Sequence, residues 1–257
     1  MSLLTLPEPA GWASSARRLT WVTVAGFVPA VLAVGFAMRS LLRGSYFTGL
    51  VTAGLGACFA LVAIALQLVR RGRTSLRAKH DSTGTTLLPG GRFSALVLAS
   101  LLLATSSMLA IAIAVPLNGL DISMSQGMKV LSPFVAGFGA LVGLVGLTTV
   151  WRRGGVGYVD FTTDGVDIAN VAFTESVDWN DIADVRDSAD SKKSRRAVVL
   201  VLRDGSEKLI DGADIYVPRG SALYWMVRHY WLRPEDRSEL TDGRALDRLR
   251  KGRFETT

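Results

Sequence analysis

Four long stretches of the chain contain no Asp, Glu, Lys, Arg or His. Each is long enough to cross a hydrocarbon core of about 30 Å as a helix that rises about 1.5 Å per residue. Ion pathways and proton relays need ionisable groups inside the membrane, so their absence here argues against transport by this chain alone. The stretches are Thr20–Met38, Tyr46–Val69, Phe93–Leu117 and Val130–Trp151. We therefore predict a four-helix transmembrane domain over residues 20–151, after a cytoplasmic N-terminal tail of residues 1–19.

The sequence is also poor in the residues that build catalytic and metal sites. It has one cysteine, Cys58, which lies inside the second apolar stretch, and two histidines, His80 and His229. These are too few for a metal cluster or a cysteine–histidine pair. We expect His229, between Arg228 and Tyr230, at the surface or rim of its domain. Nucleotide-binding loops carry the pattern Gly-x-x-x-x-Gly-Lys or Gly-x-Gly-x-x-Gly after a strand, and the sequence has neither pattern in such a position. We predict no enzyme activity, no cofactor and no metal site.

Five aspartates recur at every third position in the C-terminal half. They are Asp178, Asp181, Asp184, Asp187 and Asp190. The series lacks the spacing and the terminal glutamate of a calcium-binding EF-hand loop. We interpret it as a solvated strand edge and loop.

The net charge of +7 is concentrated beside the apolar stretches. Residues 1–151 hold 11 Lys and Arg against 3 Asp and Glu, whereas residues 152–257 hold 18 against 19. Because the surplus lies in short segments next to helices, it indicates membrane topology rather than binding to nucleic acid.

The positions of these cations orient the predicted helices. Short loops rich in Lys and Arg stay on the cytoplasmic side of a membrane. One side would carry Arg17, Arg18, Arg70, Arg71, Arg73, Arg77, Lys79, Arg92, Arg152 and Arg153. The other side would carry only Arg39, Arg43 and Lys129. We predict a multi-pass protein of the inner or plasma membrane with both termini in the cytoplasm.

After Trp151 the continuous apolar runs give way to alternating residues separated by Asp-Gly turns, which is typical of antiparallel strands. The predicted strand regions are Gly157–Phe161, Val166–Ile168, one region of Glu175–Trp179 together with Ile182 and Val185, Ala197–Leu202 and Lys208–Ile210. In the loop Arg70–Arg92, the stretch 81–91 can add a short strand or clasp to this soluble domain. The sequence leaves that addition open.

A helix with apolar residues at helical spacing follows the strands. Ser221 is placed to cap it, and Pro234 stops it. Residues 234–257 form a polar C-terminal helix or tail.

The strands, the central pattern Val177–Val185 and the following amphipathic helix resemble the bacterial pleckstrin-homology-like domains that are attached to membrane helices. The resemblance covers residues 155–233. It implies that residues 152–233 form a small, mainly β barrel in the cytoplasm, with a capping helix whose Trp225 or Trp231 lies in the core. The predicted fold class is thus a four-helix membrane bundle followed by a pleckstrin-homology-like β domain.

One basic loop of the β region is a candidate binding site for anionic lipid. Its cations are Lys192, Lys193, Arg195 and Arg196. Basic loops at the barrel mouth bind anionic lipid in many pleckstrin-homology domains, and each cation near a charged leaflet contributes about 1 kcal/mol. The alternative is a solvated hairpin tip balanced by Asp187 and Asp190.

Small residues at four-residue spacing form candidate packing faces on two of the predicted helices. They are Ala136, Gly139, Ala140 and Gly143 on the fourth helix, and Gly49, Ala53 and Ala57 on the second. Small residues let helix backbones approach closely within a membrane. The faces serve either packing within the bundle or docking against a partner's helices.

Two functions follow from these features. The first is a non-catalytic accessory or scaffold subunit of a larger integral membrane complex. The second is a membrane module that senses anionic lipid through its β domain. In overall organisation the chain also resembles small actinobacterial membrane proteins associated with Mce-type lipid importers, which implies a permease-type partner. In either case the partners are membrane lipids and membrane proteins, and not nucleic acid.

The predicted topology is tested with reporter fusions. Because the two predicted outer links hold three cations against ten on the other side, fusions at Ser45 and Gln126 should report an external location. A fusion at Thr257 should report the cytoplasm, and an external signal there would contradict the orientation.

Overall fold

The computed structural model describes residues 6–170, 173–189 and 195–256, and only the backbone of residues 13–25. The chain forms two compact units. The helical unit comprises Thr20–Gln67 and Ala95–Gly154. The β unit comprises Met1–Leu19, Leu68–Ser94 and Gly155–Thr257.

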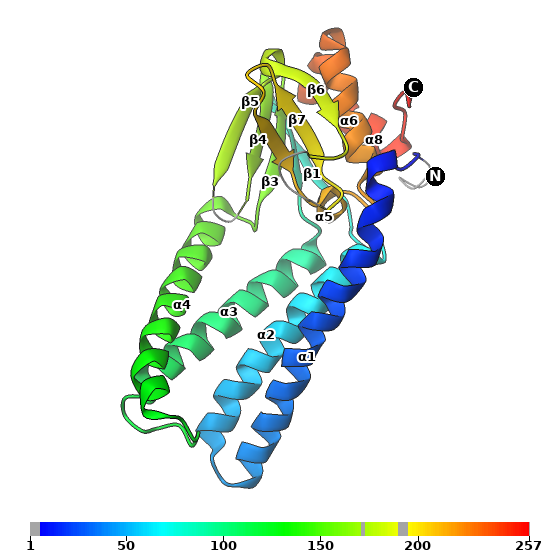
Figure 1. The fold of residues 1–257 in the computed structure, drawn as a ribbon. Helices are drawn as coiled ribbons and strands as arrows, with labels where there is room; N and C mark the ends of the chain where they lie inside the picture. The colour runs from blue at the N-terminus through cyan, green and yellow to red at the C-terminus, as the bar shows by residue number, and fades with distance from the viewer. Residues whose placement is uncertain (1–5, 171–172, 190–194, 257) are drawn as a thin grey trace. The chain divides into compact units, whose positions relative to one another are not determined.

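Four long helices make up most of the first part of the chain (Figure 1). They are α1 (Ser15–Leu42), α2 (Tyr46–Arg70), α3 (Gly91–Ala114) and α4 (Gln126–Arg153). Helices α2, α3 and α4 are long and apolar enough to cross a membrane, whereas the described apolar part of α1, Gly26–Leu42, is shorter. The predicted stretch Phe93–Leu117 overran its helix, because α3 stops before Pro116.

Local signals fix the ends of α4. The Ser125 side chain accepts a hydrogen bond from the backbone N–H of Met128, which caps the first turn. After Arg153 the chain turns at Gly154, whose φ of 68° is the left-handed conformation that glycine adopts without steric cost.

The small residues of α4 face α3 inside the helical unit. Ala136, Ala140 and Gly143 are buried. A Cβ atom added to Gly143 would lie 2.1 Å from Thr105 Oγ1, and one added to Gly139 would lie 3.6 Å from Met108 Cγ. This face is therefore occupied by the chain's own helix.

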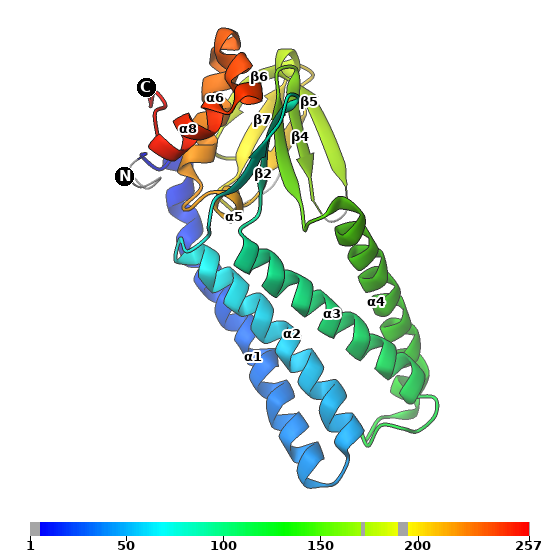
Figure 2. The same ribbon diagram turned by 180° about the vertical axis from the view of Figure 1, so that it is seen from behind.

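Helix α2 uses its small residues in the same way. A Cβ atom on Gly49 would lie 2.8 Å from Leu41 Cγ of α1, and one on Gly54 would lie 2.5 Å from Ser107 Oγ of α3. Ala53 and Ala57 are half-buried. Both views show α3 beside α2 and α4 (Figure 2). The bundle is held by close contacts between successive helices.

The β unit contains two antiparallel sheets. The first runs in the order β1 (Arg77–His80), β2 (Gly84–Leu88), β3 (Tyr158–Thr162), β4 (Gly165–Ala169) and β5 (Thr174–Asp178). The second runs in the order β6 (Ile182–Arg186), β7 (Val198–Leu202) and β8 (Glu207–Ile210). Each predicted strand region contains strand, but the region from Glu175 to Val185, which we had predicted as one, is divided by residues 179–181 into β5 of the first sheet and β6 of the second.

The loop between α2 and α3 supplies the first two strands. Asp81 makes the turn between them by accepting hydrogen bonds from the backbone N–H groups of Thr83 and Gly84. Strand β2 then pairs with β3, so that Leu87 lies opposite Val159. A Cβ atom on Gly84 would lie 2.3 Å from the Phe161 carbonyl oxygen, so only glycine fits there. The strand that the sequence had left open is thus present.

Short helices complete the β unit. They are η1 (Ala10–Ser14), η2 (Trp179–Asp181), α5 (Ala213–Tyr216), α6 (Ser221–Leu232), η3 (Pro234–Ser238), α7 (Glu239–Asp242) and α8 (Arg244–Lys251). The prediction that Ser221 caps α6 is wrong. Gly220 occupies the cap position with a φ of 82°, and Ser221 is buried in the first turn.

The core of the β unit draws on both chain ends as well as the sheets. Phe161, Trp179 and Met226 are fully buried, as expected for inward positions of strands and of the capping helix. The segments that we had predicted as an N-terminal tail and as a polar C-terminal helix or tail also contribute, since Trp12 and Leu249 are buried in the same cluster. The ends of the chain are therefore part of the β unit.

Replacing Gly143 by Leu tests the packing inside the helical unit. The added side chain cannot fit against Thr105, so the full chain in detergent should lose about 1–3 kcal/mol of stability, read as a lower thermal midpoint. Gly35→Leu is the matched control, because nothing lies within 4 Å of a Cβ atom there. Equal midpoints for the two variants would contradict the internal contact.

Candidate functional site

The predicted basic loop is only partly available for a ligand. Lys192 and Lys193 lie outside the described residues. The Arg195 guanidinium donates two hydrogen bonds of 2.7 Å to the two carboxylate oxygens of Asp214. Arg196 donates to Glu8 Oε1 at 2.8 Å, and its Nη1 lies 3.9 Å from Asp214 Oδ2. Both arginines are therefore engaged by acids of the same unit.

Asp214 is the buried partner in this ion pair. Its side chain is 1% exposed, and burial raises its pKa to about 6, although the positive charges of Arg195 and Arg196 oppose the shift. The backbone around it is also fixed, since Thr74 Oγ1 donates to the Asp214 carbonyl oxygen at 2.9 Å. Removing one partner of such a buried pair costs about 3–5 kcal/mol, so this pair supports the structure.

The N-terminal segment lies against the same region. Trp225 Nε1 donates to the Pro7 carbonyl oxygen at 3.0 Å, and the backbone N–H of Gly11 donates to Asp187 Oδ2 at 2.7 Å. Trp12 Nε1 donates to the buried Ala197 carbonyl oxygen, and its ring meets Tyr224 edge-on at 6.1 Å. These contacts attach the segment before α1 to α6 and to the residues next to β6 and β7.

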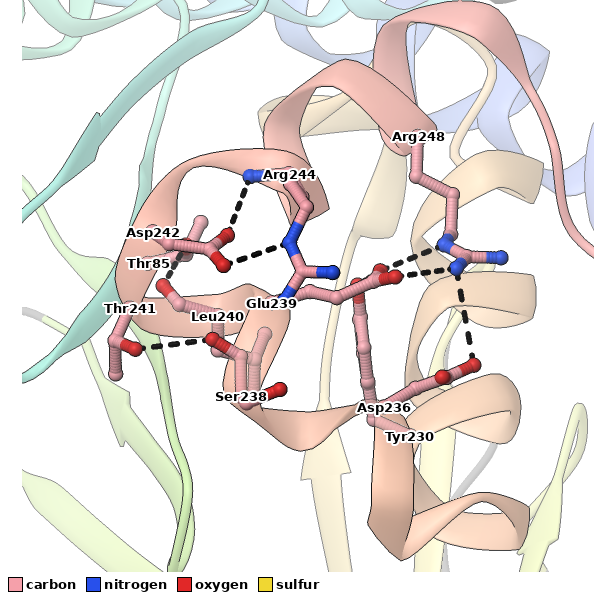
Figure 3. Close-up of polar contacts among 10 residues, drawn as sticks. All are labelled: Thr85, Tyr230, Asp236, Ser238, Glu239, Leu240, Thr241, Asp242, Arg244 and Arg248. Atoms are coloured by element: carbon pink, nitrogen blue, oxygen red, sulfur yellow. Dashed lines mark hydrogen bonds and ion pairs between the residues drawn. The ribbon is translucent and has the colours of Figure 1, made fainter.

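A second polar cluster holds the C-terminal helices (Figure 3). Arg248 donates to both carboxylate oxygens of Glu239, and the Tyr230 hydroxyl donates to Glu239 Oε2 at 3.2 Å. The bonds from Arg248 lower the pKa of Glu239, whereas burial and the nearby Glu239 charge raise the pKa of Tyr230. Thr85 Oγ1 adds a bond to the Leu240 carbonyl oxygen. The cluster joins α6, α7 and α8 to β2.

His229 lies in the core beside this cluster, so the predicted surface or rim position is wrong. Its side chain is 3% exposed because α8 and the following segment cover α6, and its ring meets Phe254 at 5.6 Å. Its Nε2 lies 2.9 Å from Asp236 Oδ2, but the geometry is not that of a hydrogen bond. Burial and then Arg248 lower the pKa of His229, while Asp236 opposes the shift. The ring is a neutral core group at neutral pH.

The aspartates spaced by three make separate contacts. Asp178 accepts from the backbone N–H of Asn180, Asp184 pairs with Arg186, and Asp187 accepts from Gly11. Asp190 lies outside the described residues. Within the ranges that the structure describes, no three or more His, Cys, Asp or Glu side chains come together as a metal site would require.

The links between the helices frame an open depression in the helical unit. It is lined by residues 44–48 and 118–121. The Ser45 hydroxyl donates to Asp121 Oδ2 at 2.7 Å, and the Asp121 backbone N–H donates to Thr48 Oγ1 at 2.9 Å. These bonds join the two links.

Two arginines with unusual backbone conformations were missed by sequence reasoning. Arg196 has a φ of 46° and Arg219 a φ of 63°, in the left-handed region that residues other than glycine seldom occupy. The Arg196 side chain donates to the Arg219 carbonyl oxygen at 3.0 Å. The one available signal was Gly220 just before a predicted helix; a glycine there is consistent with its own φ of 82° but gives no sign that Arg219 is left-handed as well.

The burial of His229 predicts a pH response. A base whose pKa is lowered on folding contributes stability that is present above its ordinary pKa of 6.5 and is lost as pH falls through the lower folded value. The thermal midpoint of the full chain should therefore fall less in His229→Gln than in the wild type between about pH 7.5 and about pH 5.5. The exposed His80 provides the control, since His80→Gln should respond as the wild type does. Identical responses of all three proteins would contradict the buried neutral ring.

Comparison with known proteins adds no relative to these observations. The chain matches no family model, no curated protein and no solved structure.

Proposed function

We propose that this protein is a non-catalytic accessory or scaffold subunit of a larger integral membrane complex. In this proposal α1 joins α2, α3 and α4 as a fourth membrane-spanning helix, and both termini lie in the cytoplasm. The excess of cations beside one set of helix ends supports that orientation. The apolar character of Gly26–Leu42 supports the fourth span.

The observation that carries the proposal is the way the chain connects its two units. It passes between them four times, after residues 19, 67, 94 and 154. A soluble domain that merely follows a membrane anchor needs one connection. Here each long helix is directly continuous with a segment of the β unit. In this proposal a displacement of any helix is transmitted to that unit through the chain. Such connectivity suits a subunit whose β unit and helices respond together to a partner.

The form of the β unit supports a pleckstrin-homology-like assignment. Strands β2–β5 and β6–β8 make up antiparallel sheets, and α6 follows them in the chain. Trp225 is 9% exposed and belongs to the core, as the resemblance implied for the capping helix. In this assignment β1 is an addition at the edge of the first sheet.

In this proposal, large apolar side chains form the surface that contacts a membrane partner. The small residues of α2 and α4 already contact neighbouring helices of the chain. On the other side of α4, Phe134 and Phe138 are 73% and 69% exposed. Side chains of this kind pack against lipid or against the helices of a second protein. A permease-type subunit, such as that of a lipid importer, is the partner we propose.

Sensing of anionic lipid is the second candidate. Its original basis, the loop of Lys192, Lys193, Arg195 and Arg196, is weakened by the engagement of the two arginines with Asp214 and Glu8. A different group of exposed arginines, Arg71, Arg73 and Arg219, favours this candidate.

Mild purification from native membranes tests the subunit proposal. The wild type should bring an integral membrane protein with it in fixed stoichiometry, measured by native mass spectrometry. Phe134→Ala combined with Phe138→Ala should lose that protein, because the substitutions remove contact area on α4.

The matched control replaces Leu32 and Phe36, which are exposed on α1, by Ala. It should retain the complex. If the wild type purifies alone as a stable single species, or if the α4 variant keeps the partner as well as the control does, the proposal in this form is wrong.

A further inference from the structure

One glycine of the β unit, Gly72, is flanked in the chain by two exposed arginines and covered by the side chain of a third. Arg71 and Arg73 flank Gly72, and all three arginines, Arg219 included, are exposed. The Arg219 stem lies over the glycine, since a Cβ atom on Gly72 would be 3.4 Å from Arg219 Cγ and 4.0 Å from its Nε. Gly72 itself has a φ of 61°, which turns the chain beneath Arg219. We call these three residues the Gly72 arginines.

The acids of this region are engaged elsewhere. Asp214 binds Arg195 through both oxygens, and Glu8 binds Arg196. Asp211 accepts from the backbone N–H of Arg195. Among the residues that the structure describes, no carboxylate lies within ion-pair distance of a Gly72 arginine. Within the described residues, the cluster is thus a set of like charges without a counter-charge.

Contacts of the surrounding backbone fix the position of Arg219. Its left-handed conformation is one that a side chain disfavours, and such outliers persist only where surrounding contacts fix them. The Arg196 side chain donates a hydrogen bond to the Arg219 carbonyl oxygen. Gly220, which follows Arg219, has no room for a side chain, because a Cβ atom there would lie 2.9 Å from the Asp214 backbone nitrogen. The ion pair around Asp214 therefore positions Arg219.

The chain sets the depth of the cluster relative to a membrane. Arg71 directly follows Arg70, the last residue of α2, which is long and apolar enough to span a bilayer. Thr74, three residues further on, is bonded to Asp214. Residues that emerge at the end of a spanning helix lie at the level of the lipid headgroups.

We propose that the Gly72 arginines bind a phosphate group, and that its source is the headgroup of an anionic phospholipid. Guanidinium groups present paired N–H donors that match phosphate oxygens, and an anion relieves the repulsion among the three cations. This site differs from the loop Lys192–Arg196, because the arginines of that loop support Arg219 instead of facing the ligand. It stands independently of the subunit proposal.

Binding is measured on the full chain in a neutral detergent. The probes are short-chain phosphatidylglycerol, short-chain phosphatidylcholine and inorganic phosphate, and the readout is the ligand-dependent rise in thermal midpoint. Phosphatidylglycerol should stabilise the wild type, and phosphatidylcholine should not. Combined Arg71→Gln, Arg73→Gln and Arg219→Gln should weaken phosphatidylglycerol binding at least about tenfold, since three charge-assisted contacts are lost.

A matched variant separates a site from general attraction. Arg203, Arg250 and Arg253 are exposed arginines of the same unit, and replacing all three by Gln removes the same charge. This control should bind phosphatidylglycerol as the wild type does. Equal weakening in both triple variants, or no binding by the wild type, would overturn the proposal. Stabilisation by inorganic phosphate equal to that by the lipid would support the phosphate site and make free phosphate its ligand.

Arg219→Gly keeps the test decisive if the triple variant folds poorly. Glycine relieves the left-handed strain, so the midpoint without ligand should stay the same or rise. Binding of phosphatidylglycerol should still weaken, because the guanidinium is gone. A variant that binds as the wild type does would show that Arg219 does not contact the ligand. Tight binding of an acidic peptide with no response to lipid would also contradict the proposal.

Discussion

The pairing of β2 with β3 is the constraint on which the rest of the β unit depends. The two strands are neighbours in the sheet, yet α3 and α4 lie between them in the chain. The ladder must therefore form across an insertion of about seventy residues, at a substantial entropic cost of closing the loop. Leu87 and Val159 oppose each other and are fully buried, and Thr86 donates to Asp160 at 2.9 Å. Burial of apolar side chains offsets the cost of closure.

This pairing also provides the surface on which the C-terminal helices pack. With β2 in place, the first sheet offers a surface to α7, and Thr85 binds the Leu240 carbonyl oxygen. Glu239 and Arg248 then fix α7 to α8. At the other end of the chain, Trp12 covers Ala197 and Tyr224. Among the described residues of the unit, the buried carboxylates Asp214 and Glu239 each accept hydrogen bonds from an arginine through both oxygens, as charged groups removed from water require.

The sequence predicts the regular elements well, because they rest on periodicity. Continuous apolar runs and alternating residues define the long helices and the hairpins of the β unit. The burial of Trp12 and His229 was beyond such reasoning. Trp12 lies in no periodic pattern, and His229 lies within a periodic helix but is covered by Phe254 from outside it. Contacts of that kind depend on the tertiary fold. The partner of Arg195 was missed for the same reason, because Asp214 lies in a short helix that has no apolar repeat.

Charge therefore has two distinct uses in this protein. Where an arginine is covered by the fold, as Arg195 and Arg248 are, an acid of the same unit binds it through two oxygens. Around Gly72, no described carboxylate lies within ion-pair distance of Arg71, Arg73 or Arg219. Repulsion within such a group is lowest when an anion or high ionic strength screens it. If selection had required these cations for membrane orientation alone, flexible side chains on an ordinary backbone would suffice. The left-handed Arg219, held by Arg196, indicates that the position of at least one of them matters.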